Sequence, residues 1–148
     1  MHALILALAL HTLAVATLAA PTPKPKPTVR VFIFTARPRP GEFAPPDLKA
    51  RADSVQDVGM AICRTVMDVK FEPAGRRENA HVFVEVLGRE LDPRREGWCL
   101  VHLKISARGK SWTVDGAEDG WRGAAEDAAK QIHAWARFNR HLILGDGE

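Results

Sequence analysis

The sequence predicts an α+β fold, a two-layer sandwich in which two helices pack on a mixed sheet of four or five strands. Three observations support this prediction. Apolar and polar residues alternate in several short segments rich in β-branched and aromatic residues, as in half-buried strands. Two longer segments repeat apolar residues at helical spacing. The helical segments enclose most of the strands, in the order β-α-β-β-β-β-α, which is typical of an α+β sandwich.

The first strand and the first helix are separated by a loop rich in proline. Residues 29–35 (VRVFIFT) have the composition of a strand, and residues 36–46 contain four prolines and a glycine. Asp47 is a favourable N-cap for the following helix. Apolar residues then recur at helical spacing as far as about Met67, so the first β-α unit ends there.

The other strands lie between this helix and a second one. We predict strands at residues 69–72, 82–87, 98–106 and 111–114, with a polar loop or single turn at 73–80. The charged segment 88–97 contains Pro93 and suits a long hairpin loop. Residues 121–141 form the final helix, whose buried stripe runs from Trp121 to Leu142.

The amino-terminal segment predicts export. Residues 3–10 are an unbroken apolar run, and residues 13–20 continue it with smaller side chains, the order expected of a signal peptide. We therefore divide the chain into a signal peptide (1–20), a Pro/Lys linker (21–28) and a single α+β domain (29–148), periplasmic or secreted. The alternative is an uncleaved membrane anchor, since the run is marginal for a span. Contact with the membrane is expected only in that case.

Composition excludes several classes of protein. Without its leader the chain has about 130 residues, one domain of ordinary size that needs no metal or disulfide to fold. Hydrophobic residues make up 46% and charged residues 26%, as in globular proteins. The formal net charge is only +3, with acidic residues interspersed, so no basic face for nucleic acid is expected.

Three segments together resemble a group of small exported bacterial proteins of unknown function. They are residues 52–57 (ADSVQD), 80–90 (AHVFVEVLGRE) and 120–135, which begins GWRGAA and ends KQIHAW. His81 departs from that pattern, in which an acidic residue is usual before the strand. The element order is also distantly similar to the amino-terminal α/β domain of TolB-type envelope proteins, which bind partner proteins. These resemblances imply fold and export, and no activity.

The two cysteines suggest a disulfide. An exported protein reaches an oxidising compartment, where disulfides persist. Cys99 alternates with Val101 and so shares its face of the sheet, and Cys63 lies near the buried stripe of the first helix. If that sheet face carries the helices, the two sulfur atoms meet. The alternative is two separate buried thiols.

No catalytic, metal or cofactor site is predicted. His133 and His141 share a helix but are eight residues apart, too far for joint ligation, and His81 and His102 lie on separate strands. The sequence has no G-x-S-x-G motif. A weak anion site is conceivable at Arg37 and Arg39, in the loop before the helix, because helix N-termini attract anions.

The sheet face opposite the helices is the predicted partner-binding surface. A solvated sheet face should carry polar side chains, but here large apolar groups mix with a few charges, as in interface patches. The predicted contact residues are Phe32, Phe34, Phe83, Leu87, Trp98 and Leu100. The alternative is that the final helix, the Pro-rich loop or the linker covers this face.

The leading functional hypothesis is an extracytoplasmic, non-enzymatic binding or interaction domain of the bacterial envelope. Its partner would be an envelope protein or a second copy of the chain. Predicted export and the lack of a catalytic motif motivate this hypothesis. The alternative is a small exported hydrolase whose site is assembled from scattered residues, so the sequence leaves enzymatic activity undecided.

Overall fold

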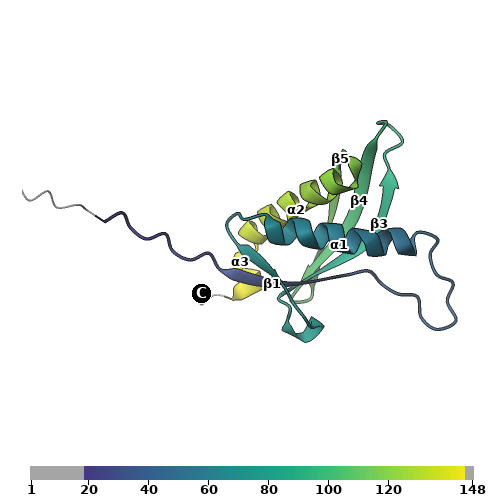
Figure 1. Ribbon diagram of the computed structural model, residues 1–148. Helices are drawn as coiled ribbons and strands as arrows, with labels where there is room; N and C mark the ends of the chain where they lie inside the picture. Colours follow the sequence, from purple (N-terminus) through teal and green to yellow (C-terminus); the bar gives the residue numbers. More distant parts are fainter. Residues whose placement is uncertain (1–18, 146–148) are drawn as a thin grey trace, which may run out of the picture.

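The computed structural model describes residues 19–145, so the predicted signal peptide lies almost entirely outside the described residues. The fold is α+β, as predicted, with a five-stranded sheet and two long helices (Figure 1). The strands are β1 (Thr28–Phe34), β2 (Lys70–Pro73), β3 (Val82–Leu91), β4 (Trp98–Ala107) and β5 (Lys110–Asp119). The helices are α1 (Leu48–Arg64), the 3-10 helix η1 (Arg77–Asn79), α2 (Gly120–Phe138) and α3 (Arg140–Leu144).

The sheet is mixed, with the strand order β2-β1-β3-β4-β5. β1 pairs in parallel with β2 on one side and with β3 on the other. β3, β4 and β5 form a run of antiparallel neighbours. β2 is short and pairs with β1 only from Thr28↔Lys70 to Val31↔Pro73. The end of β1 therefore extends beyond its outer neighbour.

The hydrophobic core lies between the sheet and the two long helices. Alternation along β1, β3 and β4 directs one set of side chains to this side. The members of that set are at most 1% exposed: Val29, Val31, Val82, Val84, Val86, Val101, Leu103 and Ile105. Val58 and Ile62 of α1 and Ile132 of α2 pack against them. These alternating sets of β1, β3 and β4 therefore lie under the helices.

Helix α2 approaches β5 closely because small residues line the contact. Ala124 and Ala128 are fully buried on α2, and Gly116 faces them from β5. A Cβ atom added at Gly116 would lie 2.1 Å from the carbonyl oxygen of Ala124 and 2.7 Å from the Cβ of Ala128. Only glycine fits at this position, and the helix rests almost directly on the strand.

Several predicted boundaries differ from the structure. β3 continues to Leu91, so the loop predicted at 88–97 is mostly strand and turn. β5 is also longer than predicted and continues to Asp119. The register of β3 against β4 shifts at a bulge between Val86 and Gly88. The final helix ends at Phe138, and the short α3 follows it. Within residues 19–145, no helix combines the length and the hydropathy needed to cross a membrane.

Candidate protein-binding surface

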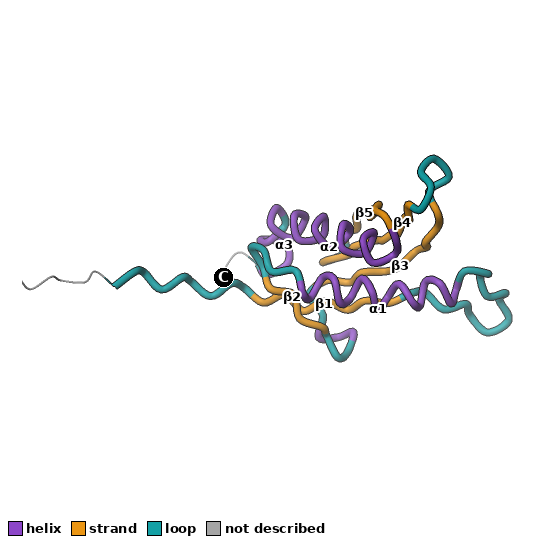
Figure 2. The backbone as a smooth tube through the Cα atoms, turned by 45° about the horizontal axis from the view of Figure 1, so that its top comes forward, coloured by secondary structure: helices purple, strands orange, loops and turns teal. Residues whose placement is uncertain are grey.

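The second face of the sheet is open. α1 and α2 lie side by side on the other face, as the ribbon and tube views show (Figures 1 and 2). The predicted contact residues are all half-buried: Phe32, Phe34, Phe83, Leu87, Trp98 and Leu100. The Pro-rich loop does not bury its own aromatic side chain, since Phe43 is 99% exposed. We call the face of the sheet that carries these six residues the open face.

An arginine covers part of the aromatic cluster on the open face. The guanidinium carbon of Arg77, in η1, lies 5.1 Å from the ring centroid of Phe34 and 5.4 Å from that of Phe83. Phe32 lies beside Phe34, with ring centroids 5.9 Å apart. A cation over an aromatic face is attracted by the ring quadrupole. The cluster is thus partly screened from water by a polar group. No sequence pattern predicts this contact, because Arg77 lies in the segment predicted as a polar loop or single turn.

The other half of the open face is ionic. The His102 ring places Nδ1 2.8 Å from a carboxylate oxygen of Asp115 and Nε2 3.3 Å from one of Glu90. Burial lowers the pKa of His102, but the two carboxylates more than offset it, so the pKa lies above its ordinary value. The bulge in β3 matters here, because it places Glu90 opposite Leu100 on the open face. The face therefore combines aromatic and charged groups.

The His102 cluster has the parts of an orienting pair but no nucleophile. Among residues 19–145, no hydroxyl or thiol is hydrogen-bonded to His102. A hydrolase of the serine or cysteine type needs such a group within reach of its base. In the same part of the chain, no group of three or more His, Cys, Asp or Glu side chains is arranged so that it could hold a metal ion. Both ring nitrogens of His102 are already engaged by carboxylates of the same chain.

Arg37 and Arg39, the predicted anion site, lie in the loop after β1, and both are exposed. Glu42 accepts a hydrogen bond from the backbone N–H of Arg39 at 3.0 Å. Asp47 does not cap the helix through its side chain, contrary to prediction. Its carboxylate instead accepts a hydrogen bond from Arg51 at 2.8 Å, an interaction that lowers the pKa of Asp47. Binding of an anion at the two arginines stays a prediction.

The predicted disulfide between Cys63 and Cys99 is wrong, because both are free thiols. Cys99 pairs with Leu91 at the far end of β3, where the neighbouring Arg89 approaches Asp53 near the start of α1 at 3.9 Å. Cys63 lies ten residues beyond Asp53 along α1, which is a distance of about 15 Å at the rise of an α-helix. A disulfide requires Cα atoms within about 7 Å. Alternation identified the correct sheet face but not the position along it.

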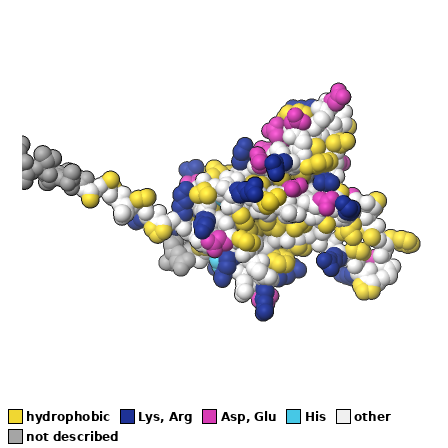
Figure 3. Space-filling model, in the orientation of Figure 1, with side chains coloured by type: hydrophobic (Ala, Val, Ile, Leu, Met, Phe, Trp, Pro, Cys, Tyr) yellow, Lys and Arg dark blue, Asp and Glu magenta, His cyan; other side chains and the backbone are white. Residues whose placement is uncertain are grey.

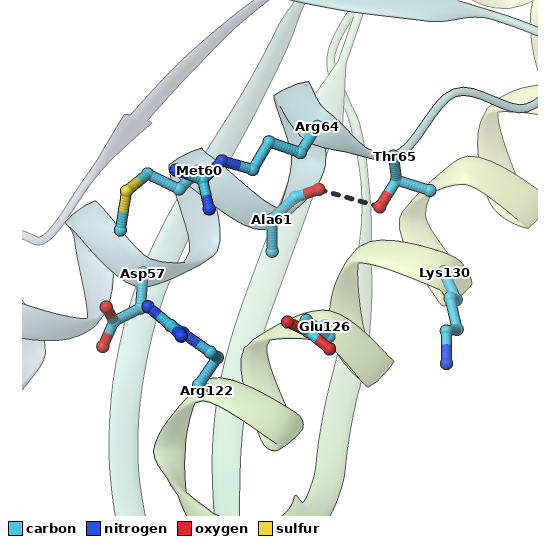
Figure 4. Close-up of a pocket in the computed structure, with 8 residues that line it drawn as sticks. All are labelled: Asp57, Met60, Ala61, Arg64, Thr65, Arg122, Glu126 and Lys130. Atoms are coloured by element: carbon cyan, nitrogen blue, oxygen red, sulfur yellow. Dashed lines mark hydrogen bonds between the residues drawn. The ribbon is translucent and has the colours of Figure 1, made fainter.

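A small charged cavity lies between α1 and α2, with a volume of about 170 Å³ (Figure 4). Arg122, Glu126 and Lys130 line it from α2, and Asp57 and Arg64 line it from α1. Figure 4 shows Arg122 directed toward Asp57. In the described part of the chain, none of these five side chains forms an ion pair within 4.0 Å. The cavity is the solvated seam between two helices.

No family model matches the chain, and no curated protein matches it. Among solved structures, a ribosomal subunit interface protein from Coxiella burnetii is similar with 6% identity and a TM-score of 0.35, over 76% of this chain and 98% of that one. A PelC dodecamer from Paraburkholderia phytofirmans is similar with 18% identity and a TM-score of 0.40, over 82% of this chain and 95% of that one. We draw no functional conclusion from likenesses at these TM-scores.

Proposed function

We propose that this protein is a non-enzymatic interaction domain of the bacterial envelope that binds a partner protein through its open face. One observation carries the proposal. Six large apolar side chains on three strands remain half-buried, with both long helices on the opposite side of the sheet. A sheet face exposed only to water normally carries polar side chains. Retaining Phe32, Phe83 and Leu100 there is the pattern of a contact surface.

The composition of the open face supports a protein partner. Aromatic side chains and arginine are the residues most often responsible for binding energy at protein interfaces. The face offers both, because Arg77 stacks on Phe34 and Phe83, and Arg95 stacks on Trp98 at 4.4 Å. The charged cluster around His102 lies at its other side and would form a polar rim. Export to the envelope rests on the amino-terminal sequence.

Site-specific cross-linking tests this proposal. A photoreactive amino acid at Leu87 should give a covalent adduct in the envelope fraction, because Leu87 belongs to the open face. The matched control carries the same group at Ala134, an exposed position on α2, and should give no such adduct. The double variant Phe83→Ser, Leu100→Ser should abolish the adduct while keeping the circular dichroism spectrum.

Two outcomes contradict the proposal. One is an adduct that persists in the double variant, and the other is no adduct from Leu87 to any protein. If the double variant fails to fold, the single variant Leu100→Ser replaces it, because Leu100 lies outside the core cluster.

A further inference from the structure

The outer edge of β1 is unpaired beyond Val31. The last contact with the β2 side is the bond from the Ala74 N–H to the Val31 carbonyl oxygen, 2.8 Å long. Along a strand, the N–H and C=O groups of alternate residues point to the same side. Ile33 therefore directs its N–H and C=O outward, and no described residue pairs with them. Such an edge is a template for another strand.

An apolar groove runs between this edge and α1. Its volume is about 850 Å³. The lining residues come from β1, the following loop and α1: Phe32, Ile33, Phe34, Thr35, Arg37, Pro38, Leu48, Lys49, Ala52 and Val55. A second groove of about 380 Å³ adjoins it and shares Phe32, Ile33 and Val55. In Figure 3, hydrophobic side chains reach the surface along α1. The edge thus offers main-chain bonds and a place for apolar side chains together.

The charge of the groove indicates what it would accept. Its charged lining residues are Arg37 and Lys49, and none is acidic. Lys49 is paired with Asp53 at 3.2 Å. Arg37 is exposed and has no ion-pair partner among the described residues. A carboxylate arriving at this end of the groove would meet a guanidinium, which can bind it through two hydrogen bonds.

We propose that the edge of β1 binds an extended segment of a partner protein as an added strand. The segment carries apolar residues at alternate positions, one of them in the groove beside Ala52 and Val55, and an acidic residue at Arg37. Its main chain bonds to the outward N–H and C=O of Ile33. Strand addition of this kind takes affinity from main-chain bonds and specificity from alternate side chains. This edge site adjoins the open face and shares Phe32 and Phe34 with it, but it does not use Phe83 or Leu100.

Peptide selection tests the site. The full soluble domain is presented to a displayed library of random ten-residue peptides. The expected result is enrichment of peptides with alternating apolar residues and one acidic residue. Ala52→Glu places a charge in the groove and should weaken binding of a selected peptide at least about tenfold. Ala134→Glu makes the same change at an exposed position of α2 and should leave binding unchanged.

Two further measurements separate strand addition from other modes of binding. Methylating peptide amides one at a time should abolish binding at one position, because a single peptide N–H donates to the outward C=O of Ile33. Arg37→Glu should weaken binding of the acidic peptide and strengthen binding of a peptide in which lysine replaces the acidic residue. The proposal is overturned if no peptide is enriched, if Ala52→Glu binds as the wild type does, or if no single amide methylation abolishes binding. Peptide binding that survives Phe83→Ser, Leu100→Ser distinguishes this site from the open face.

Discussion

The two faces of the sheet are built by the same strands but differ in what they contact. On the covered face, Val84, Leu103 and Ile105 are 0% exposed under α1 and α2. On the open face, their neighbours Phe83 and Leu100 are half-buried. The residues that stabilise the fold and the residues proposed to bind a partner lie on opposite sides of one layer. Substitutions on the two faces should therefore have effects of different size and kind.

The closest contact of the covered face is the most sensitive position. Gly116→Ala should destabilise the protein by about 3 kcal/mol, the upper end of typical overpacking costs, because its Cβ would overlap the Ala124 carbonyl oxygen. Gly75→Ala is the control, since nothing lies within 4 Å of the Cβ it adds. Its cost should stay within about 0.5 kcal/mol. Urea unfolding measures both, and equal costs would contradict the close approach of α2.

Substitutions of two leucines on β4, one on each face of the sheet, allow a direct comparison of the two faces. Leu103→Ala should cost about 3 kcal/mol, because it leaves a cavity under the helices. Leu100→Ala on the same strand should cost under about 1 kcal/mol, because Leu100 is already partly hydrated. Urea unfolding measures the free energy of unfolding of both variants. If Leu100→Ala is as costly as Leu103→Ala, the open face belongs to the core.

His133 makes the covered face sensitive to acid. It is 1% exposed, its Nε2–H donates to the carbonyl oxygen of Ile62 at 2.9 Å, and its Nδ1 has no partner. Burial lowers the pKa of His133 below its ordinary 6.5. Its contribution to stability is therefore complete above that value and is lost as the pH falls through the folded-state pKa. The loss of stability between pH 7.5 and about pH 5 should be smaller in His133→Phe than in the wild type. An identical loss would contradict this.

His102 gives the open face the opposite pH dependence. Its pKa is raised above 6.5, so its ion pairs add stability below that value and lose it as the pH rises through the folded-state pKa. His102→Gln should therefore destabilise more at about pH 5 than at about pH 8. Titration followed by NMR should show the raised pKa and a lower one in Asp115→Asn. A His102 pKa unaffected by that substitution would rule out the pairing.

The smallest expected effect concerns the thiols. Burial raises the pKa of both Cys63 and Cys99, and the two are not joined. Adding a reductant should leave the thermal unfolding midpoint unchanged. Thiol counting after denaturation without reductant should find two groups per chain. One disulfide and no thiols would show that Cys63 of α1 and Cys99 of β4 come together.

Regular elements were predictable from the sequence because their side chains face one environment throughout. The alternating valines of β3 and the apolar spacing of α1 predicted the core residues correctly. The extension of β3 was missed because the bulge after Val86 breaks the alternation on which the prediction depends. The same bulge moves Arg89 to the helix side, where its guanidinium lies over Trp121 at 4.5 Å.

The open face was predictable and the groove beside it was not. Alternation alone predicts which side chains of β1, β3 and β4 point away from the helices. The groove depends on how far β1 extends beyond β2, and this follows from the pairing of Val31 with Pro73, which no sequence pattern shows. Arg77 was missed for a related reason, because it lies in a short 3-10 helix between two strands, where side-chain contacts follow no sequence period.

The position of β1 between two parallel partners has a consequence for the order of folding. β3, β4, β5 and α2 are consecutive in the chain and adjacent in space, so they close over short loops. β1 pairs with β3 across a much larger separation, as in Val31 with Val82. Contacts between residues distant in sequence form later than local ones. We expect the carboxyl-terminal strands to assemble first, so that the first strand to be synthesised is among the last to find its neighbours.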